Sequence, residues 1–211
     1  MKRRSVEMVD RFKTVLLFGA PGAGKGTQGK MLSNIPGFYH CASGDVFRRV
    51  DPHSKLGRVF YEYSSRGELV PDDVTVSMWD EAIHAHILLC DYRPHSDLLI
   101  LDGIPRTPQQ AELMDRYIEV LKVVHLTCDE PEKMFARLQA RAEKEGRHDD
   151  ADDAVIRRRW DVYEKETHPV LAHYASEVIG KVKAAGTPAE VLAGVLSILA
   201  PVQVEHFSVG D

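Results

Sequence analysis

The chain has 211 residues, 44% of them apolar and 28% charged, which is typical of a folded protein with one sizeable domain. A net charge of −5 argues against a nucleic-acid partner. The three cysteines are far apart and do not have the spacing of a zinc site, so we expect them to be reduced thiols in a cytoplasmic protein. We also expect no membrane span and no secretory signal, because residues 1–12 lack an apolar core.

The first predicted element is a buried strand over Thr14 to Phe18, followed by the glycine-rich stretch Gly19-Ala20-Pro21-Gly22-Ala23-Gly24-Lys25 and a helix from about Gly26 to Ile35. The spacing G-x4-G-K in this context indicates a phosphate-binding loop (P-loop), in which backbone N–H groups and the lysine bind phosphates. Gly26 stands where Ser or Thr usually follows the lysine, so direct ligation of Mg²⁺ by a hydroxyl is less expected here.

A mostly helical segment separates this strand from the next strong one. A short strand is predicted over Phe38 to Cys41, with Ser43 as the N-cap of the next helix. Residues 45–89 then form a helical excursion, broken at Asp51-Pro52, Gly67 and Pro71. The excursion is a candidate small lobe.

Strands and helices alternate in the second half. The predicted elements are a strand over Leu98 to Asp102, a helix over Pro108 to Val120, a strand over Lys122 to Cys128, a helix over Glu130 to Glu143, a polar loop over Lys144 to Asp153, a long helix over Ala154 to Ala175, a strand over Val178 to Val182 and a helix over Pro188 to Leu199. This alternation implies a parallel sheet covered by helices.

Charged side chains around this sheet suit phosphate chemistry. Asp102 ends a buried strand, so we expect it at the ligand-binding edge of the sheet as a partner of Mg²⁺, through water. Arg106 follows in the same loop, and Arg137 and Arg141 share one helix face. Adjacent helical positions point about 100° apart, so not all of Arg157-Arg158-Arg159 can face a central site.

Taken together, these motifs resemble the adenylate kinases over about residues 14–190. The resemblance is carried by Gly19 to Gln28, Ser43 to Arg48, Gly67 to Val70, Asp102 to Thr107, Gly146 to Asp150, Arg158, and Tyr163 to Pro169. It implies an α/β P-loop NTPase fold, a three-layer sandwich around a five-stranded parallel sheet. It also implies a monomer that transfers a phosphoryl group reversibly from MgATP to AMP, giving two ADP.

The resemblance further implies roles for individual residues and segments. ATP would bind Gly22, Ala23, Gly24, Lys25, Gly26, Thr27, Arg137, Arg141 and Gly186, and AMP would bind Ser43, Arg48, Leu69, Val70, Gly103, Arg106, Gln110, Arg147 and Arg158. The implied catalytic set is Lys25, Asp102, Arg106, Arg141, Arg147 and Arg158. The core would comprise residues 13–41, 72–139 and 151–200, with a monophosphate-binding lobe at 42–71, a short lid at 140–150 and a tail at 201–211.

Other functions remain as alternatives. A UMP/CMP kinase shares the fold and lid length, but Ser43, Thr107 and Gln110 favour AMP. A catalytically silent nucleotide-binding regulator is disfavoured because Lys25 and the arginines are present, and a P-loop GTPase because the chain has no Asn-Lys-x-Asp motif. The short lid also lacks the small domain that carries zinc in long-lid relatives, so zinc is not expected.

Overall fold

The computed structural model describes residues 11–128, 130–145 and 152–207. Its strands are β1 (Phe12–Gly19), β2 (Phe38–Ala42), β3 (Leu98–Asp102), β4 (Ile118–Thr127) and β5 (Ile179–Lys183). They form one parallel sheet in the order β2-β3-β1-β4-β5, which confirms the predicted five-stranded sheet. Strand β3 is buried at every position, and its sequence is therefore a continuous apolar run.

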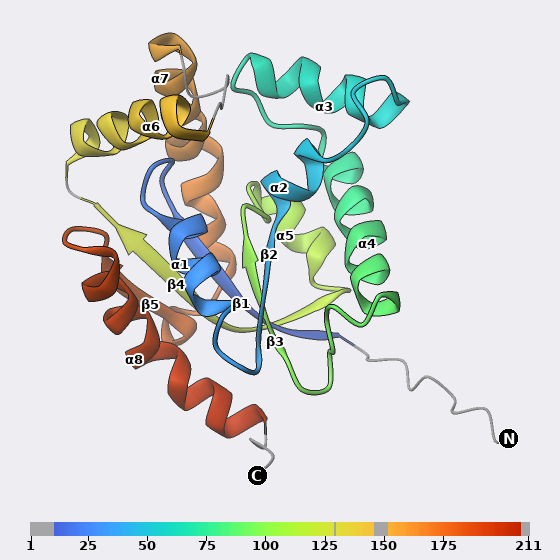
Figure 1. Ribbon diagram of the computed structural model, residues 1–211, viewed down its shortest axis with the longest axis vertical. Helices are drawn as coiled ribbons and strands as arrows, with labels where there is room; N and C mark the ends of the chain where they lie inside the picture. Colours follow the sequence, from blue (N-terminus) through green and yellow to red (C-terminus); the bar gives the residue numbers. More distant parts are fainter. Residues whose placement is uncertain (1–10, 129, 146–151, 208–211) are drawn as a thin grey trace, which may run out of the picture.

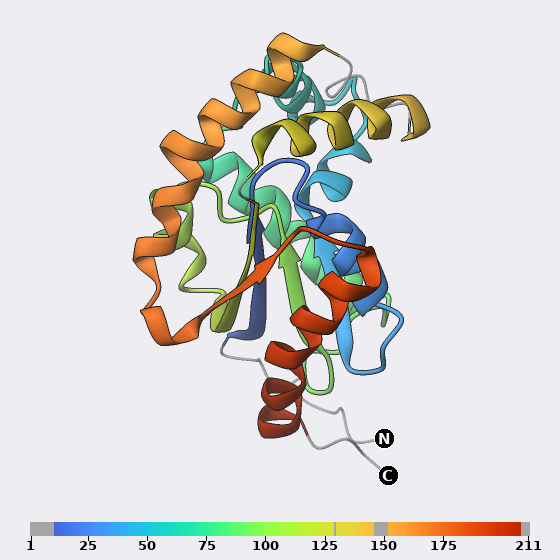
Figure 2. The ribbon, with the colours of Figure 1, turned by 90° about the vertical axis from the view of Figure 1, so that its left-hand side faces the viewer.

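Helices cover both faces of this sheet (Figures 1 and 2). They are α1 (Lys25–Leu32), α2 (Ser43–Arg48), α3 (Lys55–Ser65), α4 (Asp72–Leu88), α5 (Pro108–Met114), α6 (Pro131–Glu145), α7 (Asp153–Val162) and α8 (Pro188–His206). One core layer packs α4, α5 and residues 163–173 against the sheet, through Trp79, Met114 and Val170. The other packs α1, α6 and α8 against the opposite face. The three-layer sandwich is thus confirmed.

A small lobe stands over the carboxyl edge of the sheet. Helices α2 and α3 lie there, and the lobe has its own core of Phe47, Phe60, Val70 and Met78. The first three of these residues fall within the predicted lobe, residues 42–71, and Met78 is supplied by α4.

Two predicted helices differ from those observed. The helix predicted over Pro108 to Val120 ends at Met114, because Ile118 and Val120 already pair with β1 as part of β4. The helix predicted over Ala154 to Ala175 leaves α-geometry after Val162, passing through a π-helical turn (Tyr163–Thr167) into a 3-10 helix (His168–His173). Pro169 explains this change, since it lacks an N–H and its ring clashes with the carbonyl four residues earlier.

Helix α8 is longer than predicted and continues through Pro201 to His206. Among the described residues it is the one helix whose length and mean hydropathy of 1.3 would suit a membrane span, which the sequence did not lead us to expect. It nevertheless packs closely on β5: a Cβ on Gly180 would lie 2.7 Å from Ile198 Cδ1. One face of α8 thus packs on the core through Val191, Val195, Leu199 and Val202, although only 22% of its apolar window is buried.

Candidate active site

The register of the sheet brings three loops to one edge. Asp102, the last residue of β3, lies beside Leu17 of β1 and beside Ala42 of β2. The glycine-rich loop after β1, the start of α2 and the loop after β3 therefore meet at the carboxyl edge, where ligands bind in open α/β sheets.

The glycine-rich loop adopts a conformation that requires glycine. Gly22 and Gly24 have φ of 84° and 92°, and a Cβ on Gly22 would lie 2.7 Å from the carbonyl oxygen of Met134. Gly24 is the N-cap of α1, which starts at Lys25 without a side-chain cap and without an acid in its first turn. The first backbone N–H groups of α1 are therefore suited to an anion.

Lys25 lies within this loop, half-buried. Its Nζ donates hydrogen bonds to the carbonyl oxygens of Gly19 at 2.7 Å and Ala20 at 3.2 Å. Burial lowers the pKa of Lys25 to about 8; the Asp102 carboxylate opposes this shift, and nearby arginines reinforce it. Those arginines are Arg106, Arg159 and Arg141. The fold thus gathers four cationic groups around one carboxylate.

A pocket joins this cationic site to the small lobe. Its wall includes Lys25, Arg48, Leu69, Val70, Gly103, Arg106, Gln110 and Arg159. Arg48 folds back over Gly44 and pairs with Asp45 at 2.6 Å. Most of the residues expected to bind AMP therefore line the same pocket as the P-loop lysine.

Ser43 lies beside this pocket, but it is not an N-cap. Helix α2 is capped by Ala42 and includes Ser43, so the predicted cap is wrong by one residue. The Ser43 side chain is fully buried, and its Oγ has no hydrogen-bond partner among the described groups. A Cβ on Gly103 would lie 2.7 Å from this Oγ. The hydroxyl thus remains available to a ligand that enters beside Gly103.

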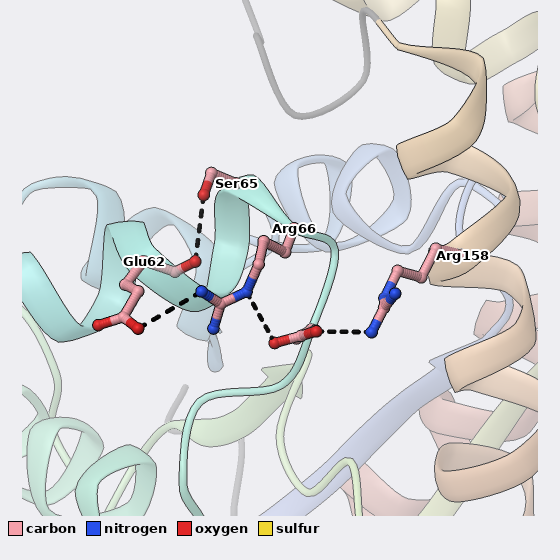
Figure 3. A network of polar contacts seen from close by, with 5 residues as sticks. Glu62, Ser65, Arg66 and Arg158 are labelled. Atoms are coloured by element: carbon pink, nitrogen blue, oxygen red, sulfur yellow. Dashed lines mark hydrogen bonds and ion pairs between the residues drawn. The ribbon is translucent and has the colours of Figure 1, made fainter.

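Two neighbouring arginines of α7 point to different places. Arg159 lines the pocket, whereas Arg158, the residue singled out from the sequence, is not one of its lining residues and extends toward the loop after α3 (Figure 3). Arg158 Nη2 pairs with Glu68 Oε1 at 2.5 Å, and Glu68 in turn accepts from Arg66. The structure therefore places Arg159 on the pocket wall and Arg158 in an ion pair with Glu68, which also lines the pocket.

Comparison with known proteins identifies one family. The family model described as Adenylate kinase matches residues 17–179. The adenylate kinase of Kocuria rhizophila is 39% identical over 76% of this chain and 84% of its own length. That of Thermus thermophilus is 36% identical over 90% of this chain and 99% of its own. The chain belongs to the adenylate kinase family.

Apart from the P-loop residues, the residues expected to bind ATP lie on α6 and on the loop after β5. Arg137 Nη1 donates to the carbonyl oxygen of Ala184 at 3.0 Å, which brings α6 close to the loop that contains Gly186. Arg141 lies one turn further along α6 and is close enough to lower the pKa of Lys25. Arg147 and the rest of the predicted lid from residue 146 onward lie outside the described residues.

The residues at the P-loop fit a magnesium ion bound together with phosphates. Asp102 is buried, and a Cβ on Gly26 would lie 3.7 Å from its Oδ2, so the carboxylate faces the start of α1. Mg²⁺ commonly takes one carboxylate and completes its shell with water and phosphate oxygens. One acid at this point is sufficient for such a site.

Arg159 could have been found from helical periodicity. Ile156 and Tyr163 are both buried, and Arg159 lies three residues after the first and four before the second. It therefore shares their helix face, whereas Arg158 does not. The apolar pattern around the three arginines was the available signal.

The lowered pKa of Lys25 predicts a pH-dependent affinity for ATP. The charged ammonium binds phosphate, and the charged fraction in the free protein falls as the pH rises through about 8. We expect the dissociation constant for ATP to rise by up to about tenfold between pH 7.5 and 9. Titration calorimetry measures this, with Lys25→Arg as the control that stays charged. The same change of the dissociation constant with pH in the two proteins would contradict the prediction.

Proposed function

We propose that this chain transfers a phosphoryl group reversibly between ATP and AMP, with Ser43 and Gln110 beside the adenine of AMP. The observation that carries the proposal is the single pocket that joins Lys25 of the P-loop to Arg106, Gln110 and the small lobe. Buried polar groups beside that pocket can discriminate between bases, because a base that leaves them unpaired is bound less well.

The chemistry needs positive charge and position rather than a covalent nucleophile. Lys25 and the N-terminus of α1 hold the phosphates of ATP, and Asp102 would hold Mg²⁺ through water, where the ion would neutralise charge on the phosphates. Arg106, Arg141 and Arg159 spread positive charge around the transferred group, and the guanidinium geometry suits phosphate oxygens. Because Arg159 lines the pocket, we assign to it the role that the family resemblance gave to Arg158.

We further propose that residues 42–71 act as the monophosphate-binding lobe, residues 140–150 as the lid, and Arg147 as a second bridging arginine. The separate core of the lobe supports its role as a unit. Closure over the pocket would exclude water that could otherwise accept the phosphoryl group. We expect the enzyme to act as a cytoplasmic monomer without a nucleic-acid or membrane partner, in keeping with its acidic charge and unpaired cysteines.

A coupled assay of ADP production tests this function. MgATP is offered with AMP, dAMP, CMP or UMP in parallel reactions. We expect a strong preference for AMP. A preference for CMP or UMP would point to the UMP/CMP kinases, and ATP binding without transfer to any monophosphate would point to a silent regulator.

The role of Gln110 is tested by the variant Gln110→Ala. We expect the KM for AMP to rise by about tenfold and the KM for ATP to change by less than twofold, because the lost amide lies on the monophosphate side. Separate Michaelis constants for the two substrates give the answer. An equal rise in both would count against Gln110 as the group that reads the base.

A further inference from the structure

Asp72, the first residue of α4, reaches across to the loop before α5. Its Oδ1 accepts a hydrogen bond from Gln110 Nε2 at 2.8 Å, and its Oδ2 accepts one from Thr107 Oγ1 at 3.0 Å. Thr107 is itself the N-cap of α5 and accepts from the backbone N–H of Gln110 at 3.0 Å. One carboxylate thus holds both the side chain of Gln110 and the turn that carries it.

The amide of Gln110 is held at its other end as well. Its Oε1 accepts from the backbone N–H of Arg106 at 2.7 Å, and the residue is only 1% exposed. The two ends of an amide are alike in shape, so its orientation depends on its hydrogen-bond partners. A carboxylate can only accept and a backbone N–H can only donate, so Asp72 and Arg106 select the same orientation.

We propose that Asp72 is a positioning residue that sets the base preference of the monophosphate site by fixing the orientation of the Gln110 amide. This inference rests on the proposed function of Gln110. In the fixed orientation the amide retains one N–H and one lone pair for a ligand. That pair suits a base edge with an amine beside an unprotonated ring nitrogen, as in adenine. It is mismatched to a carbonyl beside a ring N–H, as in hypoxanthine.

A purely structural role for Asp72 makes a different prediction. Asp72 and Asp73 both lie in the first turn of α4, where an acid stabilises a helix through its dipole. If only the negative charge at the start of α4 mattered, neutralising either residue would change the preference for AMP over IMP by the same factor. Asp73 is exposed and adjacent in sequence, so Asp73→Asn is the matched control.

The test compares AMP with IMP, which is the same size and differs at the recognised edge. In Asp72→Ser the short hydroxyl cannot reach the positions of both carboxylate oxygens. We expect the ratio of kcat/KM for AMP to that for IMP to fall by about tenfold, with the KM for ATP within twofold of wild type. Asp72→Asn retains an oxygen that can accept from Gln110 Nε2 and should keep most of the ratio, and Asp73→Asn should leave it unchanged.

A fall in the ratio that is the same in Asp72→Ser, Asp72→Asn and Asp73→Asn would overturn the proposal in favour of a charge effect. Adding Asp72→Ser to Gln110→Ala should change the ratio no further, because Asp72 acts through that amide. If Asp72→Ser does not fold, Asp72→Glu keeps the charge but displaces the carboxylate, and an unchanged ratio there would overturn the proposal. Wild-type protein that fails to phosphorylate AMP would overturn the function itself, whereas active wild type with an unchanged ratio in the Ser variant overturns only the role of Asp72.

Discussion

Replacing Lys25 by methionine should lower kcat/KM by about a hundred- to a thousandfold or more, while the protein stays folded. The ammonium of Lys25 lies in the P-loop beside the first turn of α1, and we propose that it holds the outer phosphates. Methionine has a similar length but carries no charge, so the substitution removes the electrostatic contribution and preserves the packing.

The stability of this variant separates the loss of chemistry from a loss of fold. Burial lowers the pKa of Lys25, so the folded state disfavours its charged form, and at pH 7 methionine removes that cost. We therefore expect a melting temperature equal to or above that of the wild type. Wild-type turnover by folded Lys25→Met would refute the P-loop assignment.

Substituting the two neighbouring arginines of α7 should give opposite results. Arg159→Ala should lower kcat by about a hundredfold or more, because it removes a positive charge from the pocket that contains Lys25. Arg158→Ala should leave kcat within about threefold of wild type. Its side chain is 57% exposed, and exposed ion pairs such as the one with Glu68 contribute at most about 1 kcal/mol.

The two variants serve as controls for each other, since each removes one arginine from the same helix. The measurement is kcat for AMP phosphorylation at saturating substrates, together with the melting temperature of each protein. A larger loss in Arg158→Ala than in Arg159→Ala would reinstate the assignment made from the sequence and would contradict the placement of α7.

Local sequence patterns were sufficient to predict those elements whose structure depends on one short stretch of the chain. The strand β3 was predicted with the bounds that the structure shows, because a strand buried on both faces must be apolar throughout. The P-loop was predicted with its strand and helix, since its glycines and lysine act within one short stretch. The order of strands and helices likewise indicated a parallel sheet.

Local sequence patterns gave the wrong secondary structure where contacts with a distant segment determine it. Residues 118–120 follow α5 without a clear break in sequence, and only pairing with β1 makes them a strand. Ser43 has the chemistry of an N-cap, but α2 starts one residue earlier and leaves its hydroxyl buried at the pocket.

The sequence by itself determined the buried strands, the P-loop and the acid at the end of β3, because each depends on residues close together in the chain. The reaction was implied by the resemblance of motifs spread over about residues 14–190. Only the tertiary structure decided which acid holds Gln110 and that residues 118–120 form part of a strand. The first depends on a contact between residues 38 positions apart, and the second depends on pairing with β1. Packing between distant segments sets both, so no local pattern specifies them.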